Sequence, residues 1–368
     1  MKGEFSFEFQ FVNLAFFDSC IDNQFVRFGG IKRLMKTIFS IFILLAVFAG
    51  VRITHADTGA PLNIAFIVSG SYTDGGWSEN GKNAILAVAK QFGAHVSAVE
   101  HVTPIQAVSV MRDYAVNDNY DVVIGHGYEF LTPAQQVAAM GTNTKFIVSG
   151  TDQSAPNVMA LNFDLSQPSY ALGVLAAHMT KTGKLGFIGG EAAPAVTVCY
   201  RGFLAGARSV NPKITVAESY TDWNQTALSK SQAEAYIQQG VDVIYQDVDA
   251  ASQGVFEAVS QANQNPTLHD HPVYVFGSNS NQNNNPTCSQ YTLASAVIYM
   301  DTAYAKAIKS VKDGTFEPGV VTENAQNGVC VVVLNPKLIG TVITPDMVKD
   351  VDAADAEILA GKIQIPSN

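Results

Sequence analysis

Short apolar runs alternate with longer segments of helical spacing along most of the chain. Runs such as LNIAFIVS at 62–69 and KFIVS at 145–149 lack the alternation of a half-exposed strand. They are typical of strands buried on both faces of a sheet. Segments such as 81–92 place apolar residues three or four positions apart, as an amphipathic helix does. The alternation of the two patterns predicts parallel βαβ units with helices on both sheet faces.

The same rhythm occurs twice, which predicts an α/β protein with two doubly wound lobes that face one cleft. Strands are expected at 62–69, 95–99, 121–124, 145–149, 157–163, 184–188, 214–218, 242–245 and 273–277. Helices are expected at 81–92, 106–116, 133–140, 168–180, 195–210, 226–239 and 253–264. We expect the first lobe to hold 57–162 and 279–297, and the second to hold 163–278 and 298–368.

A different pattern precedes this domain. Residues 38–50 form an apolar run of about 13 residues, which is shorter than the roughly 20 that a transmembrane helix requires. Charged Lys36 stands before the run, and small residues, Thr54 and Ala56, stand at the −3 and −1 positions of a cleavage site. Residues 35–56 are therefore predicted to be a cleavable secretory signal peptide, with a periplasmic mature protein.

Two details refine this prediction. Val51 stands where a lipoprotein signal would carry a cysteine, so we do not expect a lipid anchor. Residues 1–34 precede Met35, where a signal peptide should begin, and we expect them to be a leader or a wrongly assigned start. The mature protein would then run from Asp57 to the end.

Composition narrows the function. The chain has 368 residues, 47% hydrophobic and 15% charged, with a net charge of −10. Removing the six basic and four acidic residues of 1–56 leaves 16 basic against 28 acidic residues, a charge of −12. An acidic chain with no basic run is a poor binder of nucleic acid. The length exceeds the roughly 250–300 residues at which one core usually divides, in agreement with two lobes.

The cysteines allow two interpretations. Outside the first 56 residues the chain has Cys199, Cys288 and Cys330. An exported protein meets oxidising conditions, and an odd count leaves one thiol over. We expect a Cys288–Cys330 disulfide, with three reduced, buried thiols as the alternative.

Residues just beyond the strand ends are the candidate ligand contacts, because such sheets bind ligands at their carboxyl edges. The glycine-rich turn after the first strand carries Asp74, a hydrogen-bond acceptor, Trp77, a stacking surface, and Ser78. The alternative is a helix-capping loop whose tryptophan covers the core. Tyr128 follows the third strand and is expected to wall the cleft. Asp152 follows the fourth, either as a ligand contact or as a cap.

The second half offers a matching set. Tyr200 and Phe203 lie near the start of a helix, where they either face Trp77 across the cleft or join the core. Trp223, Asp247 and Asn279 each follow a strand in this half and complete the candidate ligand-binding residues.

Other chemistry finds no support in the sequence. Gly76 to Gly81 has the glycine spacing of a phosphate loop and Lys82 follows, but Asn83 replaces the required hydroxyl. No G-x-S-x-G motif and no helical zinc spacing occur. We therefore expect no catalytic residues, no metal and no cofactor, and a ligand without phosphate.

Several motifs, in order, resemble the BMP (basic membrane protein) family of ABC transporter substrate-binding proteins. They are Asp74-Gly75-Gly76-Trp77, 184–190 (KLGFIGG), 203–207 (FLAGA), Asn211-Pro212, 240–244 (GVDVI) and 359–366 (LAGKIQIP). The resemblance implies a type I periplasmic binding fold with a hinge, and a monomer that captures purines or nucleosides for an ABC permease and ATPase. It also implies that aromatic residues stack the base and that carboxylates and a lysine hold the ribose.

The chain departs from this family at two places. It has Asn279-Ser280-Asn281-Gln282 where many members carry Asp-x-Asp-Gln, and 295–298 (SAVI) where they carry Ser-x-x-Lys. An amide and an aliphatic side chain thus replace the groups expected on the ribose, and an amide lacks the charge-assisted strength of a carboxylate. We therefore predict a purine base or another planar heterocycle. A sensor for a membrane receptor and an exported nucleoside-processing enzyme are the alternatives.

Overall fold

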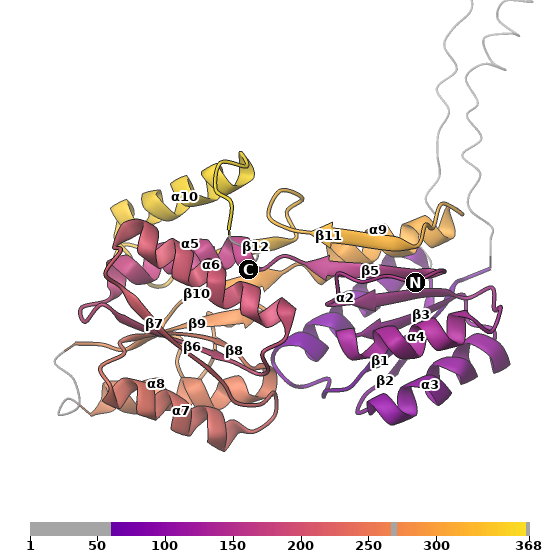
Figure 1. Cartoon of the computed structure of the whole chain (residues 1–368), viewed down its shortest axis with the longest axis horizontal. Helices are drawn as coiled ribbons and strands as arrows, with labels where there is room; N and C mark the ends of the chain where they lie inside the picture. Colours follow the sequence, from indigo (N-terminus) through magenta and orange to yellow (C-terminus); the bar gives the residue numbers. More distant parts are fainter. Residues whose placement is uncertain (1–59, 266–270, 366–368) are drawn as a thin grey trace, which may run out of the picture. The chain divides into compact units, whose positions relative to one another are not determined.

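The computed structural model describes residues 60–265 and 271–365, which form two lobes, each built on a six-stranded sheet (Figure 1). The chain divides into a unit Met1–Ala60 and a unit Pro61–Asn368, and nearly all described residues belong to the second. The leader expected at 1–34 and the signal peptide expected at 35–56 lie outside the described residues. Within the described residues, every helix is too short or too polar to cross a bilayer.

The first lobe is a parallel sheet in the order β11-β5-β4-β3-β1-β2. Its strands are β1 (Asn63–Val68), β2 (His95–Val99), β3 (Val122–His126), β4 (Lys145–Ser149), β5 (Val158–Phe163) and β11 (Gly319–Glu323). Its helices are α2 (Trp77–Phe92), α3 (Pro104–Arg112), α4 (Leu131–Ala138) and α9 (Met300–Lys312). The side chains of Ile64 to Val68 have no exposed surface, which explains the unbroken apolar run of β1.

The second lobe repeats this design in the order β12-β10-β9-β8-β6-β7, with only β12 antiparallel to its neighbour among the described strands. Its strands are β6 (Lys184–Gly189), β7 (Thr215–Tyr220), β8 (Val243–Asp247), β9 (Tyr274–Asn279), β10 (Thr292–Ile298) and β12 (Cys330–Leu334). Its helices are α5 (Ser166–Met179), α6 (Pro194–Val210), α7 (Thr226–Gln238), α8 (Ser252–Gln264) and α10 (Pro345–Leu359). Two doubly wound lobes were predicted from the sequence, and the fold class is confirmed.

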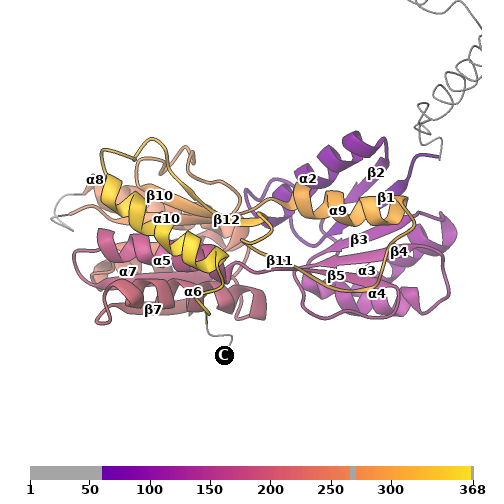
Figure 2. The same cartoon turned by 90° about the horizontal axis from the view of Figure 1, so that it is seen from above.

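The expected division of the C-terminal half between the lobes is wrong. The described chain passes between the lobes after β5, after β10 and after β11. Segment 279–297, expected in the first lobe, stays in the second, since β10 pairs in parallel with β9. Segment 298–368, expected in the second lobe, begins by returning to the first. There α9 packs on α2 and β11 pairs with β5, as Figure 2 shows.

Hydrogen bonds explain why 279–297 does not leave the second lobe. The Asn283 side-chain amide donates to the Val333 carbonyl of β12 at 2.9 Å. Ser295 of β10 donates its hydroxyl to Asn283 Oδ1, also at 2.9 Å. The asparagine-rich segment is therefore a local connection fastened to its own sheet.

The expected Cys288–Cys330 disulfide is also wrong. Cys199, Cys288 and Cys330 are free and buried. Cys288 packs in the cluster beneath α7 and α8, whereas Cys330 belongs to the larger core of α5, α6 and α10. Burial raises the pKa of Cys288 to about 12, so this thiol stays protonated and unreactive.

Candidate functional site

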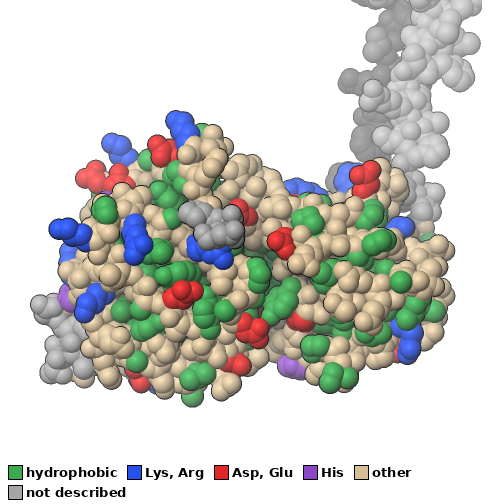
Figure 3. Space-filling view, in the orientation of Figure 1, with side chains coloured by type: hydrophobic (Ala, Val, Ile, Leu, Met, Phe, Trp, Pro, Cys, Tyr) green, Lys and Arg blue, Asp and Glu red, His purple; other side chains and the backbone are tan. Residues whose placement is uncertain are grey.

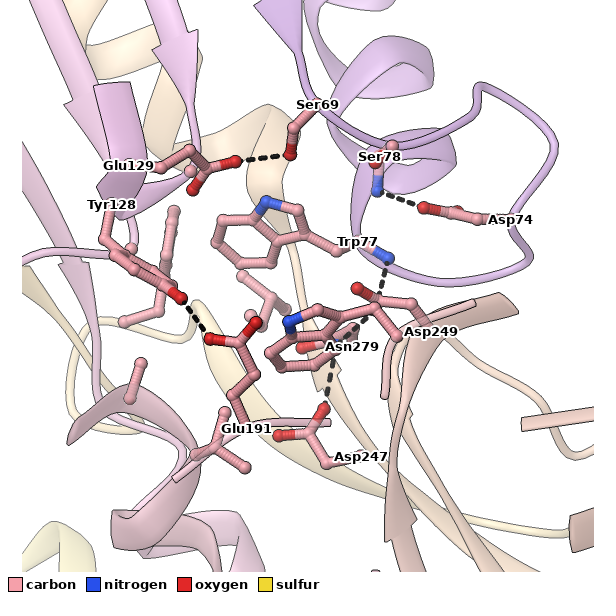
Figure 4. Close-up of a pocket in the computed structure, with 18 of the residues that line it drawn as sticks. Ser69, Asp74, Trp77, Ser78, Tyr128, Glu129, Glu191, Asp247, Asp249 and Asn279 are labelled. Carbon is pink, nitrogen blue, oxygen red and sulfur yellow. Dashed lines mark hydrogen bonds between the residues drawn. The ribbon is translucent and has the colours of Figure 1, made fainter. Parts of the chain in front are cut away.

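A cavity of about 360 Å³ lies between the lobes at the carboxyl ends of the strands. This is within the range of small-molecule sites. Acidic side chains lie along the boundary between the lobes on the face drawn in Figure 3. Seven of the ten residues expected to bind the ligand line the cavity: Asp74, Trp77, Ser78, Tyr128, Trp223, Asp247 and Asn279. Figure 4 shows several of them around the indole of Trp77.

Trp77 is the first residue of α2, four residues earlier than the helix start expected at Gly81. Its indole stacks on the imidazole of His126, with ring centroids 4.2 Å apart and planes 7° apart. One edge packs on Gly150, where an added Cβ would lie 3.2 Å from Cζ2. Phe163 meets the indole at 79°. With one face covered by His126, the remaining face is the surface that a planar ligand can use.

Trp223 lines the cavity from the opposite lobe. It lies flat over Gly190, where an added Cβ would come within 2.2 Å of the indole. The Gly189-Gly190 pair after β6 therefore makes room for this aromatic side chain.

Asp74 has a structural role in this site. Its Oδ1 accepts from the backbone N–H groups of Gly76 and Glu79 at 2.9 and 3.0 Å, and its Oδ2 accepts from that of Ser78 at 2.9 Å. Both oxygens therefore cap the exposed N–H groups at the start of α2. The alternative of a capping loop thus describes Asp74, while Trp77 still reaches the cavity.

Asp247, Asp249 and Asn279 form a polar cluster on the second lobe. The Asn279 amide donates to Oδ1 of Asp247 at 3.0 Å and to Oδ1 of Asp249 at 3.3 Å. Ser278 also donates to Oδ1 of Asp247, at 2.9 Å. The backbone N–H of Trp77 donates to Oδ1 of Asp249 at 3.1 Å, which ties this cluster to the first lobe.

Burial makes these carboxyl groups hard to ionise. It raises the pKa of Asp249 well above its usual range, and the nearby Asp74 and Asp247 carboxylates raise it further. Burial also raises the pKa of Asp247, against the hydrogen bonds that favour its charged form. A ligand that donates N–H groups would relieve part of this penalty.

Two more acidic residues complete the lining. Glu129 accepts a short hydrogen bond from the Ser69 hydroxyl, and burial raises its pKa. Glu191, directly after β6 and Gly190, accepts from the Tyr128 hydroxyl at 2.8 Å across the two lobes. Among the described residues that line the cavity, none is Lys or Arg.

The lobes touch at several points around the cavity. The Gly75 carbonyl accepts from the Ser280 hydroxyl at 2.9 Å and from the Gln282 amide at 3.1 Å. The Asn80 amide of α2 donates to the carbonyls of Asn279 and Ile298 at 2.8 and 3.0 Å. The described arrangement is thus a closed one, in which both lobes contribute to one site.

Three expected contacts do not line the cavity. Phe203 is fully buried and packs on Tyr245 and Phe276, so the core alternative is the right one. Tyr200 lies on the same helix and packs on Phe187. Asp152 is exposed beyond β4 and lies outside the lining.

Glu129, Glu191 and Asp249 also line the cavity and were not among the residues predicted from the sequence. Each lies within two or three residues of a strand end, so the rule that selected Tyr128 and Asp247 could also have found them. Ile298, where the family resemblance implies a lysine, lines the cavity as well. Across the described residues, no group of His, Cys, Asp and Glu has the arrangement of a metal site.

Similar proteins are known both in sequence and in structure. The family model described as ABC transporter substrate-binding protein PnrA-like matches residues 62–368. The ABC transporter nucleoside-binding protein BmpA of Lactococcus lactis is 30% identical over 69% of this chain and 75% of its own. A purine-binding protein of Brucella abortus is 28% identical over 72% of each chain. The solved structure of an ABC transporter solute-binding protein from Aeropyrum pernix shares the fold, with a TM-score of 0.73 and 20% identity over 84% of this chain and 94% of that one.

Proposed function

The chain belongs to the PnrA-like family of ABC transporter substrate-binding proteins, and from this premise we propose that it captures a free purine base or a related planar heterocycle. The observation that carries the proposal is a cavity lined by two indoles and five carboxyl groups, with no Lys or Arg among its described lining residues. Each feature selects one property of the ligand.

The indoles select a flat ring. Trp77 is held rigidly by His126 on one face, so its other face is available for stacking without reorganisation. Stacking of a base on an aromatic side chain contributes about 1–3 kcal/mol. Trp223 supplies a second flat surface from the other lobe.

The carboxyl groups select hydrogen-bond donors. Carboxylates accept bonds from the N–H groups of a purine, and a carboxyl group that keeps its proton can donate to a ring nitrogen. A phosphorylated or carboxylated ligand would face Glu129, Glu191, Asp247 and Asp249 with no cation among the described lining residues. Each of these groups that is ionised would repel an anionic ligand, and no described lining residue supplies a compensating cation, which argues against such a ligand.

Two residues favour a base over a nucleoside. The Asn279 amide already donates to Asp247 and Asp249, so its donor capacity is used within the protein. Ile298 presents an aliphatic side chain to the cavity, where a lysine is implied by the resemblance. Both ligand classes occur in the names of similar proteins, a nucleoside-binding one from Lactococcus lactis and a purine-binding one from Brucella abortus.

Mass spectrometry of ligand retained by the purified protein tests the proposal directly. Isothermal titration calorimetry then compares adenine and hypoxanthine with adenosine and inosine, with glucose as the unrelated control. We expect the bases to bind more tightly than their nucleosides, and glucose not to bind. Tighter binding of the nucleosides would overturn the preference for a base, and binding of glucose alone would overturn the purine class.

The cellular role follows from the same proposal. We propose a periplasmic monomer that delivers its ligand, unchanged, to an ABC permease and ATPase. Deleting the gene should abolish uptake of labelled base. Normal uptake with a lost transcriptional or motile response to the base would instead indicate a sensor. Release of free base from a nucleoside incubated with the pure protein would indicate an enzyme.

A further inference from the structure

We infer that His126, which is not among the residues that line the cavity, is a positioning residue that fixes the indole of Trp77 for the ligand. This inference rests on the proposed function when it is tested by the affinity for a purine. Its second readout, the spectrum of Trp77, needs no ligand.

Three contacts tie His126 to Trp77. The two rings stack with centroids 4.2 Å apart and planes 7° apart. Nε2 of His126 lies 2.9 Å from the Trp77 carbonyl oxygen. In return, Nε1 of Trp77 donates to the His126 carbonyl at 3.3 Å. The stacking sets the plane of the indole, the bond from Nε1 to the His126 main-chain carbonyl sets its rotation within that plane, and the bond from His126 Nε2 to the Trp77 main-chain carbonyl fixes the backbone that carries it.

His126 itself has no room to move. The ring of Phe66 lies on it at a centroid distance of 5.2 Å. On the α2 side, a Cβ added to Gly81 would lie 2.3 Å from Nε2, so only glycine allows the helix to approach this closely. His126 has 1% of its surface exposed, and it serves as a fixed backing for the indole.

The hydrogen bonds specify the tautomer. A carbonyl oxygen only accepts, so Nε2 of His126 carries the proton and Nδ1 is the acceptor. The hydroxyls of Ser149 and Tyr304 each lie 2.7 Å from Nδ1. Burial lowers the pKa of His126 to about 3, so the imidazole stays neutral and this pattern holds at every physiological pH.

Tyr304 connects the contact between His126 and Trp77 to α9, the helix with which the chain returns to the first lobe. It lies on α9, which follows the passage of the chain from β10 back to the first lobe. The orientation of Trp77 therefore depends on a hydroxyl more than 200 positions away in sequence. Tyr304 is itself fully buried and is not among the residues that line the cavity, so its effect on a ligand passes through His126.

The test uses three single variants. His126→Phe keeps a flat ring and removes the polar contacts of the imidazole, while the main-chain carbonyl that accepts from Trp77 Nε1 remains. Tyr304→Phe and Ser149→Ala each remove one hydroxyl that contacts Nδ1 and leave the imidazole of His126 unchanged. Tyr299→Phe is the matched control, because Tyr299 is 45% exposed and lies five residues before Tyr304. Each is measured for adenine and hypoxanthine affinity, and each is also made in a Trp223→Phe background, in which Trp77 is the sole tryptophan of the chain.

We expect His126→Phe to weaken binding by about tenfold and Tyr304→Phe by about fivefold, as lost buried hydrogen bonds do. The emission and near-ultraviolet circular dichroism of Trp77 should change in both, and Tyr299→Phe should match the parent protein. Unchanged affinity and an unchanged Trp77 spectrum in folded Tyr304→Phe and Ser149→Ala would overturn the inference, even if His126→Phe does not fold. If the parent protein binds no purine, the proposed function fails, and the spectra still test the positioning role.

Discussion

The hydroxyl of Tyr128 lies 2.8 Å from Oε2 of Glu191 and joins the two lobes at the rim of the cavity. Burial, together with this hydrogen bond, raises the pKa of Tyr128, so the hydroxyl is the donor and the carboxylate the acceptor. Because the partners come from different lobes, the bond exists only in the closed arrangement and favours it over an open one.

Tyr128→Phe removes this bond and leaves the ring at the rim. We expect ligand affinity to fall about two- to tenfold, mostly through faster dissociation, because one hydrogen bond contributes about 0.5–1.5 kcal/mol. Stopped-flow measurement of the two rate constants checks this. Glu191→Gln and the double variant complete a cycle that isolates the pair. Full additivity of the two single effects would contradict a direct link.

Trp77→Ala removes the stacking surface. We expect affinity for a purine base to fall about tenfold or more, in line with about 1–3 kcal/mol for stacking on one aromatic side chain. Trp77→Phe keeps a smaller flat ring and should lie between the two. Calorimetry on all three proteins provides the comparison, and equal affinity of the alanine variant would refute stacking on Trp77.

Gly76→Ala places a methyl group between the lobes. The new Cβ would lie 2.8 Å from Oδ1 and 3.0 Å from Cα of Asp249, so the closed arrangement must shift. We expect weaker binding and a larger radius of gyration with ligand, measured by small-angle scattering. Thr73→Ala, an exposed change in the same turn, is the control and should close normally. Identical scattering of the Gly76 variant with ligand would argue against this steric role.

Asp249→Asn should change the stability of the fold and the affinity for the ligand in opposite directions. An aspartate ionises near pH 3.9 in the unfolded chain, whereas burial and two neighbouring carboxylates raise its pKa when folded. The folded protein therefore holds a proton that the unfolded chain has lost, and stability falls as pH rises from about 4 through the folded pKa. The amide does not titrate, so we expect the variant's Tm, without ligand, to rise relative to that of the parent as the pH is raised from about 4 towards the folded pKa.

The same variant should bind the ligand more weakly, because an amide NH2 group, which only donates, replaces one of the two carboxyl oxygens. Asparagine tolerates the left-handed backbone at this position, where φ is 44°. Thermal unfolding across the pH range and calorimetry at pH 7 measure the two effects. A Tm below that of the parent by one constant amount at every pH would show that the carboxyl group is not penalised in the fold.

The buried cysteines predict a simple thiol count. The folded protein should react slowly with a thiol reagent, because Cys199, Cys288 and Cys330 are buried and protonated. After denaturation without reductant, a chain starting at Asp57 should expose three thiols, and the whole chain four. A count lower by two would restore the disulfide that the sequence suggested.

The alternation of buried strands and amphipathic helices could be predicted from the sequence, because parallel strands covered on both faces are continuous apolar runs. Trp77, Tyr128 and Asp247 were found because the carboxyl edge of such a sheet collects ligand contacts. The lobe to which β10 and α9 each belong could not be predicted from the sequence pattern. Both sheets need the same kind of strand, and the choice depends on pairing with β9 and packing on α2.

The burial of Phe203 could have been predicted from the spacing of apolar residues on its helix, but its aromatic side chain also made it a candidate for stacking on a ligand. Val196, Cys199, Phe203 and Ala207 are three or four positions apart on α6, and all are buried. This periodicity assigns Phe203 to the core. The support that His126 gives to Trp77 had no such signal, since it depends on contacts among four elements that are distant in sequence.

The late return of the chain to the first lobe has a consequence for the order of folding. Strand β5 is an unpaired edge until β11 arrives with residues 319–323, which follow it much later in the sequence. Exposed parallel edges of this kind are prone to aggregation. The same return to the first lobe begins with α9 (Met300–Lys312), which delivers the Tyr304 hydroxyl to His126. A chain interrupted before α9 would thus carry both an open sheet edge and an unfinished binding site, so a product able to compete for ligand forms only when the returning segment is present.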